Sequence, residues 1–167
     1  YSTYGGTATN NATISVGESD ATNSIYSIGM AAGFIGDKAT PAYTGNIINN
    51  GTINVTGKES IGMYGVGSGT TVYNCTPTNK SATINLSADG TMGMYLDEGA
   101  KGYNYGKITT VGSPKKAVGI VVRKGAEFTN EGTVNINSAG GYVFFKANGG
   151  VIKNYGTFTI SGGAGKE

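Results

Sequence analysis

The side chains that most often carry out catalysis are scarce in this sequence. Its 167 residues include no histidine, one cysteine (Cys75) and one arginine (Arg123). Without histidine the chain cannot form a Ser-His-Asp triad, a Cys-His pair or a histidine metal ligand. Cys75 therefore has no histidine base, and we expect its thiol to lie on the surface side without a catalytic role.

The charged residues with the most suggestive spacing are Asp97-Glu98 and Arg123-Lys124, which stand at the same offset in successive repeats. Enzymes that cleave polysaccharides use paired carboxylates as general acid and base or nucleophile. Opposite charges on neighbouring rungs of a sheet are, however, ordinary cross-strand pairs. We therefore predict ion pairs, no enzyme, no catalytic residue and no cofactor or metal. A polysaccharide-active enzyme remains a distant third possibility.

Two short motifs alternate along the chain and indicate its fold. The first reads Asn-x-Gly-Thr-Ile-x-Val. Its threonine or equivalent is found at Thr13, Thr52, Thr83, Lys107, Thr133 and Thr157. The second, Gly-Met-Tyr or a variant, is found at Gly29, Gly62, Gly93, Gly119 and, less clearly, Gly141. The intervals between the threonine positions are 39, 31, 24, 26 and 24 residues, which indicates a repeat of roughly 24–26 residues.

Apolar and polar residues alternate within these motifs, as they do in strands with one buried face. The second motif supplies a predicted inward column of Ile61 and Met63, Met92 and Met94, and Val118 and Ile120. A third segment supplies Ile47, Val72, Phe128 and Ile152. Stacked coils bury a core that no single coil can bury. We therefore predict an all-β, right-handed parallel β-helix of about five full coils plus a partial one, forming one unit over residues 1–167.

The first motif also predicts a ladder of stacked asparagine amides, and Gly51, Gly106, Gly132 and Gly156 permit the turn that follows. The ladder residues would be Asn10, Asn49, Asn74, Asn104, Asn130 and Asn154. Both roles are structural.

Three segments exceed the coil length and are predicted to be surface insertions. They are residues 18–24, 34–45 and 76–81. We expect the last two to lie on neighbouring coils beside the same asparagine turn and to form one protrusion. Its candidate ligand contacts are Phe34, Asp37, Lys38 and Tyr43. The alternative is a tolerated insertion without a role.

A second candidate contact surface is the outward column of the second motif. It consists of Tyr64, Tyr95, Val121 and Val143. Contiguous exposed aromatic and aliphatic side chains can mark an interaction patch, and tyrosine is enriched at interfaces. The simpler explanation, which we favour, is that tyrosine suits any strand.

Three stretches of the sequence resemble a known family: Ser60–Tyr64, Gly93–Tyr95 and Gly125–Asn130. With the first motif they are similar to the passenger repeats of type V autotransporters, most closely those of the large fusobacterial outer-membrane adhesins. The resemblance implies a long passenger displayed outside the cell by a C-terminal outer-membrane β-barrel. It also implies attachment to host cells or other bacteria. No binding residue carries over, because the shared motif is scaffold.

Composition argues against nucleic-acid binding and against a membrane-spanning segment. A net charge of +2 is too small for a nucleic-acid footprint, and no apolar run is long enough to span a membrane. Because the chain begins at Tyr1, we interpret it as a segment excised from a longer passenger. We expect an adhesin segment on the bacterial surface that binds a host cell-surface protein or glycan, or a partner bacterium. The alternative is a spacer rod that holds a distal binding tip.

Overall fold

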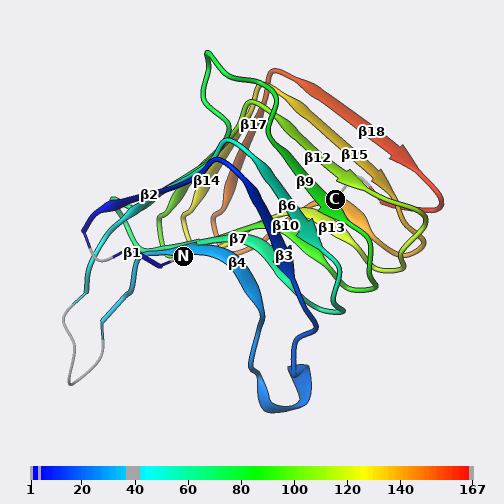
Figure 1. Cartoon of the computed structure of the whole chain (residues 1–167), viewed down its shortest axis with the longest axis horizontal. Helices are drawn as coiled ribbons and strands as arrows, with labels where there is room; N and C mark the ends of the chain where they lie inside the picture. Colours follow the sequence, from blue (N-terminus) through cyan, green and yellow to red (C-terminus); the bar gives the residue numbers. More distant parts are fainter. Residues whose placement is uncertain (1, 4, 37–41, 166–167) are drawn as a thin grey trace.

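The computed structural model describes residues 2–3, 5–36 and 42–165, and its strands wind into three parallel sheets (Figure 1). Sheet A contains β1 (Ser2–Thr3), β4 (Ile28–Ala32), β7 (Ile61–Val66), β10 (Met92–Asp97), β13 (Val118–Val122) and β16 (Tyr142–Lys146). Sheet B contains β2 (Thr7–Asn10), β5 (Asn46–Asn49), β8 (Thr71–Asn74), β11 (Lys101–Asn104), β14 (Glu127–Asn130) and β17 (Val151–Asn154). Sheet C contains β3 (Thr13–Val16), β6 (Thr52–Val55), β9 (Thr83–Leu86), β12 (Lys107–Thr110), β15 (Thr133–Asn137) and β18 (Thr157–Ser161).

Each coil takes one strand from sheet B, then one from C, then one from A, and every strand pairs in parallel with its equivalents in the adjacent coils. The threonine positions of the first motif lie in register: Thr13 pairs with Thr52, and Thr52 with Thr83. The right-handed parallel β-helix predicted from the repeat is thereby confirmed. The one helical element in the described residues is the 3₁₀ turn η1 (Ala21–Asn23), and no described helix has the length and apolar character needed to cross a membrane.

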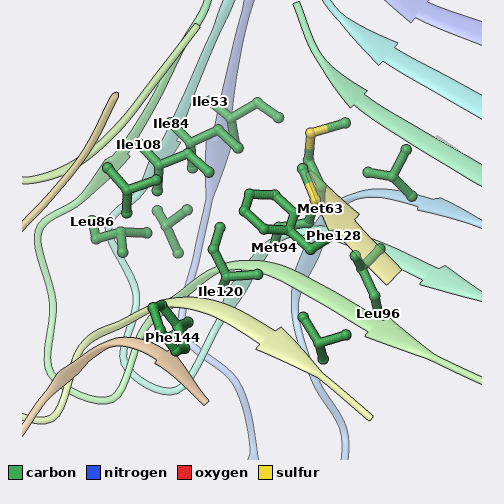
Figure 2. Close-up of a cluster of buried hydrophobic side chains, with 14 of the residues drawn as sticks. Ile53, Met63, Ile84, Leu86, Met94, Leu96, Ile108, Ile120, Phe128 and Phe144 are labelled. Atoms are coloured by element: carbon green, nitrogen blue, oxygen red, sulfur yellow. The ribbon is translucent and has the colours of Figure 1, made fainter. Parts of the chain in front are cut away.

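The core is a set of stacked apolar columns inside the three sheets. Ile53, Ile84 and Ile108 follow one another on successive coils of sheet C (Figure 2). Met63, Met94 and Ile120 form the corresponding column of sheet A and are fully buried, as predicted. Burial of such columns is the main stabilising contribution to a solenoid, because each coil covers the apolar face of its neighbour.

The predicted asparagine ladder is confirmed. From Asn10 to Asn130, the side-chain Nδ2 of each ladder asparagine donates to Oδ1 of the asparagine in the following coil, at distances of 2.7–2.9 Å. The ladder lies at the corner between sheets B and C, and its members from Asn49 to Asn130 are fully buried. Buried amides need such partners, because an unpaired polar group in the interior is costly.

The sheet A strands depart from the predicted alternation at the second motif. The pairing register passes over Gly62 and Gly93, and a Cβ on Gly62 would approach the Gly93 carbonyl oxygen to 2.7 Å. Because the glycine and the following methionine both face inward, the residue before the glycine faces outward. The prediction that Met92 and Val118 belong to the inward column is therefore wrong, because both are only half-buried and lie outside the core cluster. Ile61 is buried, at 5% exposed, but it too packs outside that cluster.

The fifth copy of the second motif also differs from its predicted register. Val121 pairs with Phe145, and Ile120 pairs with Phe144. Val143 is fully buried, whereas Phe145 is 45% exposed and occupies the outward position. The assignment of Val143 to the outward column is wrong, because the copy is centred two residues later than Gly141.

The glycines that follow four of the ladder asparagines, Gly51, Gly106, Gly132 and Gly156, are required by close packing between coils and not by a left-handed backbone angle. A Cβ on Gly132 would overlap the carbonyl oxygen of Gly106 in the preceding coil. A Cβ on Gly106 would likewise overlap the carbonyl oxygen of Ala82. Neither glycine has a left-handed φ. The turns of successive coils therefore approach too closely for a side chain between them.

Replacement of Gly132 by alanine is expected to lower the free energy of unfolding by about 1–3 kcal/mol, because backbone atoms must move to admit the methyl group. Urea denaturation followed by circular dichroism measures the change. The matched control is Gly17→Ala, since a Cβ at Gly17 meets no atom within 4 Å. The control should stay within about 0.5 kcal/mol of the parent. Equal urea midpoints for the two variants would contradict the close-packing explanation.

The insertions begin and end at three different corners of the coil (Figure 1). Residues 18–24 connect sheet C to sheet A, residues 34–45 connect A to B, and residues 76–81 connect B to C. The prediction of a single protrusion formed by 34–45 and 76–81 is wrong, because strands of sheet B separate the two corners. The excess length of a coil gives the size of an insertion but does not assign it to a corner.

Cys75 occupies a different environment from the one expected. It is fully buried, and its Sγ accepts a hydrogen bond from the Ala82 backbone N–H at 3.4 Å. Its φ of 74° is left-handed, and it begins the insertion at residues 76–81. The thiol therefore packs beneath that insertion, and the prediction of a surface-side thiol is wrong.

Candidate functional site

The outer face of sheet A carries a groove centred on two neighbouring tyrosines. Tyr64 of β7 and Tyr95 of β10 are direct neighbours in the pairing register. Their ring centroids are 5.6 Å apart and the ring planes are inclined by 39°. Both side chains point outward because Met63 and Met94, one residue earlier, point into the core. The sequence correctly predicted these two residues as an outward pair.

The groove has a volume of about 580 Å³ and is mainly apolar. It is lined by Tyr26, Ile28, Ile61, Tyr64, Met92, Tyr95, Asp97 and Arg123. Tyr26 comes from the connection that contains the 18–24 insertion, so this loop forms one wall. The volume lies within the range of small-molecule sites, roughly 300–1,000 Å³. A second hollow shares Met92, Tyr95 and Arg123 and extends the surface past Val121 to Phe145.

Polar groups stand at one edge of the groove. The Arg123 Nη1 donates to the Tyr95 hydroxyl oxygen at 2.6 Å. Asp97, at the end of β10, is only 9% exposed, and its Oδ1 accepts from the Glu98 backbone N–H at 3.0 Å. The arginine thus fixes the position of the Tyr95 ring, and an aspartate lies beside it.

The surroundings shift the ionisation of these groups. Burial raises the pKa of the Tyr64 hydroxyl above its ordinary value of 10.0, and the nearby Asp97 carboxylate raises it further. The hydrogen bond to Tyr95 raises the pKa of the Arg123 guanidinium. The groove therefore presents a neutral tyrosine and a permanently charged arginine throughout the physiological pH range.

The raised tyrosine pKa values predict that the folded chain becomes less stable at alkaline pH. Burial raises the pKa of Tyr64, Tyr73 and Tyr105 in the folded chain above the value of 10.0. Below pH 10 these tyrosines are neutral in both states. Above it, they ionise more readily in the unfolded chain, so the free energy of unfolding falls as pH rises. We expect urea midpoints that are constant across neutral pH and fall above about pH 10. A midpoint that rises through this range would contradict the shifts.

Two of the candidate ligand-contact residues in the 34–45 insertion, Phe34 and Tyr43, line a separate hollow. Phe34 and Tyr43 bond to each other through their backbones at 2.9 and 3.0 Å, and their rings stack with centroids 5.4 Å apart. This pair lines the hollow together with Glu98. Asp37 and Lys38 lie outside the described residues. Phe34 and Tyr43 therefore lie together, but the hollow that they line is distinct from the groove at Tyr64 and Tyr95.

The predicted charge alignment is correct for one pair. Lys124 Nζ lies 2.6 Å from Glu98 Oε1, with the two side chains 44% and 35% exposed. Arg123 stands one rung from Asp97 as expected, but its hydrogen bond goes to Tyr95 instead. The offset of opposite charges does not reveal this partner, because the Tyr95 hydroxyl lies diagonally across the sheet from Arg123.

A second tyrosine pair, which the sequence analysis did not single out, lies on sheet B. Tyr73 and Tyr103 are neighbours in register, with ring centroids 4.8 Å apart and planes inclined by 10°. The near-parallel rings cover each other's faces, and neither residue lines any of the three hollows described above. Outward tyrosines thus occur on two faces, and those of sheet A line the groove.

The groove depends on residues that sequence reasoning placed elsewhere or ignored. Ile61 and Met92 were assigned to the core, whereas Asp97 and Arg123 were assigned to surface ion pairs. A usable signal was present: Arg123 is the single arginine, and it stands two residues after Val121 in the tyrosine column. Alternation places both on the outer face.

Comparison with known proteins identifies the family. A family model described as the BigA third pectate lyase-like domain matches residues 1–75 and 77–167. No curated protein and no solved structure matches the chain. The match suggests a bacterial surface protein with a pectate-lyase-like β-helix, in agreement with the three stacked sheets. The chain belongs to the BigA third pectate lyase-like domain family.

Proposed function

We propose that this chain is an adhesin segment that attaches the bacterial surface to host cells or to other bacteria. It would be part of an autotransporter passenger displayed at the outer membrane, like those of the large fusobacterial adhesins that its repeats resemble. Its partner would be a host cell-surface protein or glycan, or a partner bacterium. The observation that carries the proposal is the groove on sheet A.

The groove supports binding because it combines apolar area with a few placed polar groups, as ligand sites do. Tyrosine provides a large, rigid contact area and is frequent among the residues that dominate binding energy. Tyr95 is already held by Arg123, so little conformational freedom is lost when a ligand packs on it. A spacer rod does not require such an arrangement.

Binding without catalysis is the simpler use of this site. Glycoside hydrolysis generally requires two carboxyl groups that flank the scissile bond. Among the residues lining the groove, Asp97 is the single carboxylate. The groove therefore lacks the carboxyl pair of a glycoside hydrolase. We propose that the segment is not an enzyme and that its pectate-lyase-like fold serves as a scaffold for binding.

The double variant Tyr64→Ala/Tyr95→Ala tests the proposal. Fluorescently labelled parent and variant are incubated with cultured epithelial cells and with bacterial cells, and binding is measured by flow cytometry. We expect the variant to bind at least about tenfold more weakly, since one central tyrosine commonly contributes about 2 kcal/mol.

The matched control is Tyr73→Ala/Tyr103→Ala, which removes a stacked tyrosine pair from sheet B. It should bind like the parent. Equal loss in both double variants would indicate a general structural effect and contradict the assignment of the groove. If the parent binds neither kind of cell, the spacer rod becomes the better account.

A further inference from the structure

Asp97 has acceptor capacity that the protein leaves unused. The whole residue is only 9% exposed, and it lines the groove on sheet A. Oδ1 accepts from the Glu98 N–H, and among the described residues no group donates to Oδ2. Oδ2 is not a buried atom, because the one buried side-chain nitrogen or oxygen without a partner among the described residues is Asn50 Oδ1. The free oxygen is therefore available to a hydrogen-bond donor on a ligand.

Arg123 leaves donors available at the same edge. Its guanidinium has five N–H groups, and the bond to Tyr95 uses one of them. Arg123 and Asp97 line the same groove but do not form an ion pair with each other. A charged donor and a charged acceptor thus stand side by side, each with capacity left. The ligand group that satisfies both is one that donates and accepts, and a hydroxyl does both.

The charge balance of the groove favours a neutral ligand. Asp97 and Arg123 carry opposite charges, and Glu98 is neutralised by Lys124 at the adjoining turn. An acidic ligand attracted to Arg123 would meet repulsion from Asp97 at close range. A cationic ligand attracted to Asp97 would be repelled by Arg123. The groove therefore complements neither a negatively nor a positively charged ligand, but it does complement the hydroxyl groups of a neutral one.

The floor of the groove argues against an extended peptide. Peptides that add to sheets bind along an unpaired strand edge, where main-chain groups are free. Here β10 lies between β7 and β13, so its backbone groups are already used in both parallel ladders. The inclined rings of Tyr64 and Tyr95 instead offer apolar surface against which the C–H face of a sugar ring can pack.

From these features, and resting on the proposed attachment function, we infer that the sheet A groove binds a neutral carbohydrate. Tyr64 and Tyr95 pack against the C–H face of a pyranose ring. Asp97 accepts a hydrogen bond from one hydroxyl, and Arg123 donates to the neighbouring one. Ile61 and Met92 form the apolar floor beneath the ring.

Two binding assays test the inference with the whole chain. In the first, epithelial cells are treated with dilute sodium periodate, which cleaves the carbon–carbon bond of vicinal diols, or with a protease, before the labelled chain is added. In the second, the chain is applied to an array of neutral, sialylated and uronic-acid oligosaccharides. We expect binding to fall sharply after periodate treatment, and array binding to neutral members.

The variant Asp97→Asn provides a finer readout. It keeps the shape and one acceptor oxygen but removes the charge, so we expect affinity for the neutral array members to fall about fivefold or more with unchanged thermal unfolding. The control Glu98→Gln alters the adjacent carboxylate, which does not line this groove, and should bind like the parent.

The outcomes separate this inference from the proposed function. Cell binding that resists periodate and is lost after protease overturns the carbohydrate assignment but leaves attachment intact. Array binding confined to acidic members also overturns it. Failure to bind cells and every array member overturns both. Binding to neutral members that Asp97→Asn weakens supports both.

Discussion

Replacement of Met94 by aspartate is expected to abolish folding or to lower the free energy of unfolding by more than about 4 kcal/mol. Met94 is fully buried in the sheet A column between Met63 and Ile120. The change removes a large apolar side chain, which alone costs about 2–5 kcal/mol, and buries a carboxylate without a partner. Because small domains are stable by only about 5–15 kcal/mol, the combined loss is close to the whole.

The matched control is Met92→Asp, two residues earlier on the same strand. Met92 lies outside the core cluster and lines the outer groove, so a carboxylate there can remain hydrated. We expect the control to retain the parent circular dichroism spectrum and to lose at most about 1 kcal/mol. Comparable destabilisation by the two variants would mean that β10 does not change orientation at Gly93.

Replacement of Asn74 by alanine is expected to lower the free energy of unfolding by about 2–4 kcal/mol, because it interrupts the ladder in its middle. Asn49 Nδ2 then loses its acceptor, and Asn104 Oδ1 loses its donor. All three residues are fully buried, so water cannot replace the missing partner without opening the turn. Urea denaturation gives the magnitude.

Asn85→Ala serves as the control, since Asn85 also donates its amide to an asparagine on the adjacent coil. Its Nδ2 lies 2.9 Å from Asn54 Oδ1, but both side chains are half-buried on the outer face of sheet C. Water can satisfy the group left behind, and the expected loss is within about 1 kcal/mol. If the two variants lose equal stability, burial is not what makes the ladder important.

The parts of the fold that could be predicted are those where the sequence repeats without interruption. Strands such as β6 and β9 of sheet C alternate strictly, as in Ile53-Asn54-Val55, so both the buried column and its register follow from the residue types. The asparagine ladder follows from the same alignment. In each case the same type of side chain recurs at the same position of every coil. Because the coils stack in register, these side chains contact one another.

The errors arise where the backbone departs from that regularity without a distinctive side chain. Gly62 interrupts the alternation of β7, and a glycine carries no polarity that would reveal which way its neighbours face. This reversal moved Ile61 and Met92 from the predicted core to the floor of the groove. Cys75 was misplaced for a related reason: an insertion folds over it, and coil lengths contain no information about that path.

The candidate site could be predicted only in part. The Tyr64–Tyr95 pair follows from the repeat, because equivalent positions of adjacent coils must touch. The Arg123–Tyr95 bond does not, since it joins non-equivalent positions and depends on the reach of a long side chain. The repeat predicts contacts between equivalent positions of adjacent coils, whereas the bond between Arg123 and Tyr95 joins two different positions of the repeat.

The polarity of the asparagine ladder has a consequence for how such a chain can change in length. Each coil presents an amide donor toward the following coil and an amide acceptor toward the preceding one, in the same sense from Asn10 to Asn154. Duplication or deletion of one whole coil in the gene would leave every remaining amide with a matching neighbour. Aspartate or serine could not occupy an internal rung on the same terms, since the former cannot donate when ionised and the latter has a shorter reach. The asparagine ladder is therefore compatible with the gain or loss of whole coils, but not with substitution of a single internal asparagine.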